Sequence, residues 1–396
     1  MHHMIVLAKQ LDLTSGDHAM NVLVLTSMPW GILRQRPQHI SVGLARRGHR
    51  IVYCQTSLEL RPSVLVSLRR EDQLFLIRET VKDLHIMNLF IFPFRGRLEH
   101  QSERLGSMLF KTLLKVFNIK PDIALLYNPQ DIFLLDVLEQ MNVKVVYDCV
   151  DEHSAFPGIS DASKILEAER KLLVRSSGVI TVSKRLYEKC SKINPNCVYI
   201  PNGVDFEYFK KATTSRRKVQ ELENLKHPII GFVGAIWDWI DVDLICELAK
   251  SHADYSILLV GPMYFGSDKL NKYSNIFAVG HKEYASLPWY LSCMDVCLIP
   301  FKINELTLAS NPIKLYEYLA AGKPVVSTAL PEVCNIPSEL VYIGKEDEDF
   351  IRKVEDAVNE TKKPQNEAIV AQRVNFAKSN SWERRIDAVE KLLRNI

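Results

Sequence analysis

The sequence predicts an α/β protein made of two parallel-sheet domains. Two segments, beginning near residues 22 and 229, share the order of a buried strand, a tight turn and an amphipathic helix. Strand and helix patterns alternate along most of the chain, which is typical of parallel sheets covered by helices on both faces. The length of 396 residues is sufficient for two domains with separate cores.

The first of these segments opens the amino-terminal domain. Residues 22–25 are all apolar and predict a buried strand. A helix is expected from about 37 to 47, because a proline fits the first turn of a helix and Gly48 can end it. A second strand begins at 51–53, so the segment forms one right-handed strand–helix–strand unit.

The second segment opens the carboxyl-terminal domain, with a strand at 229–233, a loop at 234–238 and a helix that runs through Leu248. Further strands are expected at 123–126, 144–147, 179–182, 197–200, 256–260, 276–278, 296–299 and 325–327. These patterns place the first domain at residues 1–205 and the second at 226–380, joined by a polar linker at about 205–226. Residues 381–396 predict a capped amphipathic helix.

Composition excludes several classes of protein. The net charge of +3 and the absence of zinc-finger or RNA-binding spacing argue against a nucleic-acid partner. Eight cysteines without a CxxC motif indicate a reducing compartment and no structural metal. No apolar run is long enough to span a membrane and the amino terminus lacks signal-peptide features, so we expect the protein in the cytoplasm.

The segment NPIKLYEYLAAGKPVVST, residues 311–328, carries the strongest functional signal. We expect Asn311 to cap a helix whose free amides, with Ser310 beside them, face an anion. Lys314 and Glu317 are three residues apart and share one side of that helix, where Lys314 can neutralise a phosphate and Glu317 can accept ribose hydroxyls. The alternative is that both are solvated helix charges.

This segment resembles the nucleotide-binding helix of GT-B glycosyltransferases, in particular the retaining enzymes that use sugar nucleotides. The resemblance implies two Rossmann-like domains that face a central cleft, with helix 381–396 crossing back to the first domain. It also implies that Glu317 binds the ribose of the donor. Relatives often carry a second glutamate eight positions earlier, near the donor sugar, where this chain has Ala309.

The resemblance extends to two other donor contacts. In the loop GFVGAIWDW, Gly234 allows close approach of a diphosphate, but the arginine and lysine that many relatives place after it are absent. The positive charge is therefore expected from Lys314, with Arg34, Arg36 or Lys184 of the first domain as alternatives that reach the site when the cleft closes. Farther along, His281 and Tyr284 resemble the region that binds the base, with a surface-loop role as the alternative for His281.

Two clusters in the first domain are candidates for the acceptor side of the reaction. Arg34, Arg36 and His39 surround the first strand-to-helix turn, where arginines can grip phosphate or carboxylate. The alternatives are an exposed turn residue for Arg36 and sheet packing for His39. Asp151 is the expected base that accepts the acceptor proton, with His153 second, although Asp151 can instead cap a following helix.

By this resemblance the chain transfers a sugar, with retention and without metal or cofactor, from a nucleoside diphosphate sugar. UDP-sugar is the expected donor, and a cell-surface polysaccharide or its lipid-linked precursor the expected acceptor, as in bacterial teichuronic acid or exopolysaccharide synthesis. The alternatives are a UDP-sugar epimerase and a non-catalytic partner of a polysaccharide synthase. An anionic membrane surface is a further candidate partner, because a helix at about 105–117 combines an apolar stripe with Lys111 and Lys115, near Arg95, Arg97 and Arg104.

Overall fold

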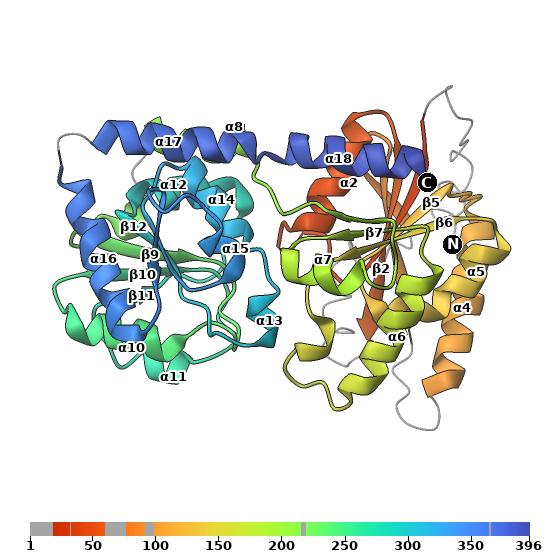
Figure 1. Cartoon of the computed structure of the whole chain (residues 1–396), viewed down its shortest axis with the longest axis horizontal. Coiled ribbons are helices and arrows are strands. Elements are labelled where there is room, and N and C mark those ends of the chain that lie inside the picture. Colours follow the sequence, from red (N-terminus) through yellow and green to blue (C-terminus); the bar gives the residue numbers. More distant parts are fainter. Residues whose placement is uncertain (1–18, 32, 60–76, 92–98, 215–218, 364–365) are drawn as a thin grey trace.

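The computed structural model describes residues 19–31, 33–59, 77–91, 99–214, 219–363 and 366–396. It contains two α/β domains that lie side by side, with two long helices running across one face of both (Figure 1). Each domain has a central sheet covered by helices, as the alternation of strand and helix patterns predicted.

The first sheet has eight strands in the order β3-β4-β2-β1-β5-β6-β7-β8, and all neighbours are parallel except β3 and β4. Its strands are β1 (Asn21–Thr26), β2 (Arg50–Glu59), β3 (Ile77–Val81), β4 (Leu84–Ile91), β5 (Ile123–Leu126), β6 (Lys144–Cys149), β7 (Gly178–Thr181) and β8 (Cys197–Tyr199). Its helical segments are α2 (Arg36–Arg46), α4 (Glu99–Val116), η3 (Pro129–Leu134), α5 (Leu135–Gln140), η4 (His153–Ala155), α6 (Ala162–Arg175) and α7 (Lys184–Cys190).

The second sheet has six parallel strands in the order β11-β10-β9-β12-β13-β14. Its strands are β9 (Ile229–Val233), β10 (Ser256–Val260), β11 (Ile276–Ala278), β12 (Val296–Ile299), β13 (Val325–Thr328) and β14 (Val341–Gly344). Its helical segments are α10 (Val242–Ser251), α11 (Ser267–Leu270), η6 (Tyr284–Ser286), α12 (Leu287–Cys293), α13 (Glu305–Leu308), α14 (Ile313–Ala320), α15 (Pro331–Cys334) and α16 (Asp347–Thr361).

Both sheets are doubly wound, which confirms the predicted fold class. The strand order reverses between β1 and β5 in the first sheet and between β9 and β12 in the second. Ligands of open α/β sheets bind at such a reversal, outside the carboxyl ends of the strands. The loops that follow β1 and β9 are therefore the parts of the fold that position a site.

The segment expected to be an interdomain linker belongs to the second domain. It forms α8 (Phe206–Phe209), α9 (Lys211–Thr214) and η5 (Gln220–Leu222). Phe206, Phe209, Ala212 and Leu222 are buried in the same apolar cluster as residues of β9 and α14. The sequence pattern was misleading because these apolar side chains are separated by lysines and threonines that remain at the surface.

The chain ends with α17 (Asn366–Ser379) on the second domain and α18 (Trp382–Asn395) on the first (Figure 1). Helix α18 packs against α2, and Trp382, Ile386 and Val389 are buried in the core of the first domain. The approach is close, since a Cβ atom added to Gly43 of α2 would lie 1.9 Å from Cδ1 of Ile386. The predicted crossing of the terminal helix is confirmed.

The apolar side chains that the sequence predicted on one stripe of α4 are partly buried and partly exposed. Leu113 and Phe117 lie in the core of the first domain, whereas Leu105, Met108 and Val116 are exposed. Arg95 and Arg97 lie outside the described residues.

None of the helices in the part of the chain that the structure describes combines the length and apolar character needed to cross a bilayer.

Replacing the α18 side chain that contacts α2 tests this packing. Ile386→Ala is expected to lower the free energy of unfolding by about 2–5 kcal/mol, because it leaves a cavity in a buried interface. Urea unfolding followed by circular dichroism measures the change. Arg384→Ala, on the exposed face of the same helix, is the matched control and should change the value by less than about 0.5 kcal/mol. Equal effects of both substitutions would contradict the packing.

Candidate active site

Helix α14 presents an ion pair at its amino-terminal end. Lys314 Nζ donates to Glu317 Oε2 at 2.8 Å, and the Glu317 side chain is almost completely buried. The helix begins at Ile313 with Pro312 in the capping position and no side-chain cap. Asn311 therefore does not cap this helix, which corrects the prediction, and the first amides of α14 have no side-chain acceptor. Lys314 and Glu317 lie on one side of the helix, as expected.

The loop after β9 runs past this ion pair. A Cβ atom added to Gly234 would lie 3.7 Å from Cε of Lys314, so the lysine side chain lies beside the loop, at the distance where a larger residue would touch it. The loop is anchored because Gly234 N donates to the carbonyl of Val260 at 2.8 Å and Tyr318 OH accepts from Val233 N at 2.9 Å. Gly234, Lys314 and Glu317 thus meet at the carboxyl end of β9, beside the strand-order reversal.

Two side chains of the first domain, Arg34 and His39, lie near the donor-site residues of the second domain. The guanidinium of Arg34 lies 4.9 Å from the ring centroid of Tyr284, which belongs to the second domain. The His39 ring is 6.0 Å from the same tyrosine and stacks on Trp382 at 4.7 Å. Burial lowers the pKa of His39 well below its usual value, and the positive charges of Arg34 and Lys314 lower it further. His39 is therefore neutral at pH 7, and the predicted residues of both domains converge.

Three buried polar atoms in this interdomain region have no hydrogen-bond partner among the described residues. They are His39 Nε2, Tyr284 OH and His153 Nε2. Burial also raises the pKa of Tyr284, and the carboxylates of Glu317 and Asp205 add to that shift. Buried polar groups are almost always paired in folded proteins, so unpaired ones mark positions where a ligand or water binds. These atoms indicate that the site accepts a polar ligand.

Arg36 has a structural role that the sequence did not reveal. Its Nε donates to Asp148 Oδ2 at 2.8 Å, and both side chains are almost completely buried. Its Nη1 also donates to the carbonyl of Pro201 at 3.3 Å. The prediction that Arg36 grips an acceptor is corrected, because the guanidinium is committed to neutralising a carboxylate at the end of β6. Arg34 remains the arginine that faces the cleft.

Asn311 joins the two domains instead of binding an anion. Asn202 N donates to Asn311 Oδ1 at 3.1 Å, and Asn202 Nδ2 donates to the Asn311 carbonyl at 2.7 Å. Asn311 Nδ2 in turn donates to Glu332 Oε2 at 3.0 Å. Glu332 also accepts from Lys184 N at 2.9 Å and from Tyr199 OH at 2.6 Å. The Asn311 side chain thus accepts from the first domain through Oδ1, while its Nδ2 donates within the second domain to Glu332 and to Tyr316 OH.

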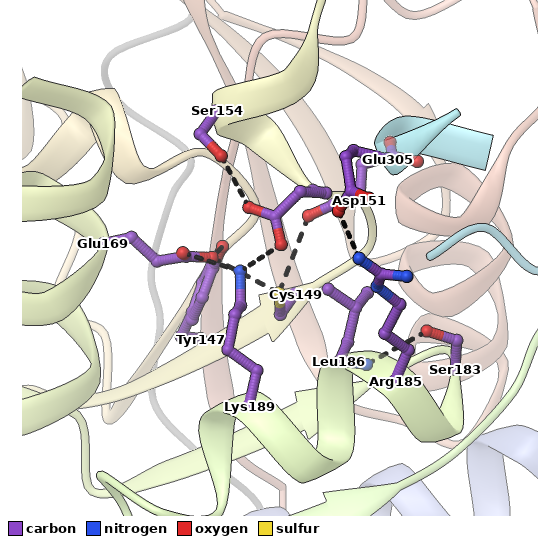
Figure 2. Close-up of polar contacts among 11 residues, drawn as sticks. Tyr147, Cys149, Asp151, Ser154, Glu169, Ser183, Arg185, Leu186, Lys189 and Glu305 are labelled. Carbon is purple, nitrogen blue, oxygen red and sulfur yellow. Dashed lines mark hydrogen bonds and ion pairs between the residues drawn. The ribbon is translucent and has the colours of Figure 1, made fainter. Parts of the chain in front are cut away.

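The candidate base lies in the loop after β6, and a group of partly buried charged side chains contacts this loop (Figure 2). Lys189 Nζ donates to Glu152 and to Glu169, each at 2.8 Å, and Glu152 also accepts from Ser154 at 2.8 Å. These contacts hold the residues that follow Asp151. Asp151 has no capping role in α6, because that helix is capped by Asp161.

The pKa values of two side chains in this loop are shifted in opposite directions. Burial raises the pKa of Asp151 to about 7. Burial also lowers the pKa of His153 to about 4, assisted by the charge of Lys189. At pH 7 the imidazole is neutral and the carboxyl group is close to half ionised. A carboxylate with a pKa near the working pH is well suited to accept a proton.

Three other predicted positions have defined places. Ala309 is fully buried in the apolar cluster of the first domain that also contains Cys149, so the position of the missing glutamate is used for packing between domains. The Ser310 hydroxyl donates to the Thr307 carbonyl at 2.8 Å. His281 is exposed in the loop after β11, and its contact with a base remains a prediction.

Sequence reasoning missed two residues of this region. Burial raises the pKa of Asp205, and the nearby charge of Arg34 opposes that shift, which places the carboxylate close to the arginine. Tyr208 stacks on Tyr284 at 5.5 Å and donates to the Ala285 carbonyl at 2.5 Å. Asp205 ends the segment PNGVD at residues 201–205, Tyr208 follows it, and both fall in the stretch that the sequence predicted to be a polar linker. An aspartate directly after a buried strand and turn was the available signal.

Within the residues that the structure describes, no group of three or more His, Cys, Asp or Glu side chains has the arrangement of a metal site. That the reaction needs no metal stays a prediction.

Comparisons with known proteins agree with this geometry. Residues 227–360 match the family model of glycosyl transferases group 1. The protein TuaH of Bacillus subtilis (strain 168), named as a glycosyltransferase of teichuronic acid biosynthesis, is 29% identical over 261 residues. That match covers 60% of this chain and 64% of the length of TuaH.

The fold has close counterparts among solved structures. Sucrose-phosphate synthase from Thermosynechococcus elongatus superimposes with a TM-score of 0.74 at 15% identity, covering 95% of this chain and 98% of that one. Anabaena HepE, solved in complex with UDP and glucose, gives a TM-score of 0.67 at 14% identity, covering 95% and 100%. The chain has the GT-B fold, and residues 227–360 of its second domain match the model of the glycosyl transferases group 1 family.

Proposed function

We propose that the protein transfers a sugar from a nucleoside diphosphate sugar to a cell-surface polysaccharide or its lipid-linked precursor. The observation that carries this proposal is the meeting of Gly234, Lys314 and Glu317 with Arg34 across the cleft, beside unpaired buried polar atoms. The name of TuaH supports a polysaccharide acceptor, and the UDP in the HepE structure supports a UDP-sugar donor.

In this proposal Glu317 accepts the ribose hydroxyls and Lys314 faces the diphosphate. The amides at the start of α14 add a positive field, because the first amides of a helix are unpaired and its dipole favours an anion. Arg34 supplies a second positive charge from the first domain. Lys314 therefore takes the place of the cations that are absent after Gly234, which favours a working donor site over a non-catalytic relative.

The transfer breaks the bond between the anomeric carbon and the diphosphate oxygen and forms a bond to the acceptor hydroxyl oxygen. The diphosphate leaves with the bonding electrons, and its charge is stabilised by Lys314, Arg34 and the helix amides. The acceptor hydroxyl loses its proton to Asp151. We propose that the anomeric configuration is retained and that these protein cations serve in place of a metal. Ala309 is buried and supplies no carboxylate at the position where relatives often carry a glutamate near the donor sugar, which disfavours the epimerase alternative.

Removal of the candidate ribose contact tests the donor site. Glu317→Ala is expected to weaken binding of one class among UDP-, GDP-, ADP- and dTDP-sugars by roughly 10- to 100-fold, since a hydrogen bond to a charged group contributes about 1.5–3 kcal/mol. Isothermal titration calorimetry measures the affinities, and circular dichroism checks the fold. Glu348→Ala removes an exposed carboxylate of the same domain and serves as the control. Unchanged affinity in Glu317→Ala would reject this donor site.

The proposed base predicts a pH profile. Because Asp151 must be ionised to accept a proton, kcat/KM should rise with pH through about 7, the pKa that burial gives this carboxyl group. Asp151→Asn should lower kcat/KM by roughly 100-fold or more and abolish the inflection. His153→Gln should keep the inflection near 7, because His153 is already neutral there. An inflection near 4, or an active Asp151→Asn variant, would contradict the assignment.

We also propose that α4 rests on an anionic lipid surface during transfer to a lipid-linked acceptor. Its exposed side includes Leu105, Met108 and Val116, with Lys115 beside them. Lys115→Ala should weaken co-sedimentation with vesicles containing phosphatidylglycerol by roughly fivefold, since each basic residue near such a surface contributes about 1 kcal/mol. Lys192→Ala, an exposed lysine on another element, is the control. Equal sedimentation with neutral phosphatidylcholine vesicles would reject the proposal.

A further inference from the structure

Three aromatic side chains form a stacked surface at the carboxyl ends of β9 and β10. The ring centroids of Trp237 and Tyr264 are 4.2 Å apart with 20° between their planes, and those of Trp237 and Trp239 are 5.6 Å apart with 23°. Trp237 is 39% exposed and Tyr264 is 55% exposed. We call Trp237, Trp239 and Tyr264 the aromatic platform. Large exposed aromatic groups of this kind are uncommon unless they bind something.

Backbone pairing between loops holds the platform in place. Ile236 and Met263 form a parallel bridge, with Ile236 N donating to the Pro262 carbonyl and Tyr264 N donating to the Ile236 carbonyl, each at 2.9 Å. The residues that follow this bridge, Trp237 and Tyr264, are therefore placed side by side.

The remaining ring of the platform is fixed in a similar way from β12. Lys302 N donates to the Trp239 carbonyl at 2.9 Å, next to a bridge between Ile240 and Phe301. Loops pinned on two sides hold their rings in one orientation, so binding a flat ligand costs little additional ordering.

The aromatic platform lies next to the candidate active site and is more exposed to solvent than the site is. The Gly234 loop that contacts Lys314 leads directly into Trp237. Across the cleft, the Phe156 ring of the first domain is 6.2 Å from Trp239 and 5.9 Å from His153. A series of ring contacts thus connects the loop of the candidate base, in the first domain, with the platform on the second.

We propose that the aromatic platform binds a sugar ring of a saccharide acceptor, one or more residues away from the hydroxyl that reacts. The face of an aromatic ring is negative, and the C–H bonds on one face of a pyranose are positive, so the two stack. Trp237 and Tyr264 cover each other's inner faces at 4.2 Å, so the sugar lies on the outer face of Tyr264, the more exposed of the two, with Trp237 supporting that ring from behind. Lys302 and Asp238 lie at the rim, with Lys302 Nζ donating to the Asp238 carbonyl at 2.5 Å. Polar groups around stacked rings suit the hydroxyls of a sugar. The inference rests on the proposed function, because it assumes a saccharide acceptor.

The test measures saccharide binding without any donor. Maltotetraose, cellotetraose, chitotetraose and a hyaluronan tetrasaccharide are titrated against the full chain, with binding followed by tryptophan fluorescence and saturation-transfer NMR. At least one tetrasaccharide should bind, and Trp237→Ala should weaken it by roughly threefold to tenfold, the range expected for one aromatic contact. Tyr264→Ala should have a similar effect. Tyr187→Ala, an exposed aromatic residue on α7, is the control.

A second readout separates this proposal from the donor site. Trp237→Ala and Tyr264→Ala should leave the affinity for UDP unchanged, and in a transfer assay they should raise KM for the saccharide while kcat stays near the wild-type value. The proposal is overturned if no tetrasaccharide binds, if both variants bind saccharide like wild type, or if they weaken UDP equally. If Glu317→Ala binds the nucleotide sugar as tightly as wild type does, the proposed function is rejected instead, whatever the saccharide result.

Discussion

The exchange of hydrogen bonds between Asn202 and Asn311 is the contact on which the geometry of the cleft depends. Both side chains are buried, and the two hydrogen bonds between these residues cross from one domain to the other. A buried amide left without its partner costs about 1–3 kcal/mol, so these hydrogen bonds favour the described arrangement of the domains over one in which the amides stay buried but unpaired. Asn311 directly precedes α14, and Asn202 accepts from Arg36 at the start of α2. One contact therefore sets the distance between the two helices that carry the candidate site.

Much of this architecture followed from local sequence patterns. Apolar runs such as that of β9 gave the buried strands, and glycines and prolines gave the turns, because parallel strands covered on both faces require continuous apolar side chains. Lys314 and Glu317 were placed correctly on one side of a helix because their spacing alone determines it. The loop after β9 was expected at the binding edge because strand order places it there. These features depend on short-range geometry.

The features that the sequence did not predict depend on contacts between residues far apart in the chain. Arg36 pairs with Asp148, 112 positions away, and no local pattern distinguishes that arginine from Arg34, which faces the cleft. The role of Asn311 depends on a turn in the other domain. Residues 206–222 looked polar because their few apolar side chains are spread among charged ones, yet these fill the second core. Burial decides such roles, and burial is a property of the folded chain.

The crossing of α18 has a consequence for how the protein is made in the cell. Residues of β1, near the beginning of the chain, share an apolar cluster with Trp382, Ile386 and Val389, near its end. A ribosome releases those last side chains only after the whole second domain has been synthesised. Domains made first usually fold first, but here the amino-terminal domain waits for the carboxyl terminus before its core is complete. Synthesis of α18, rather than of the first domain alone, is the step that supplies the last side chains of this core.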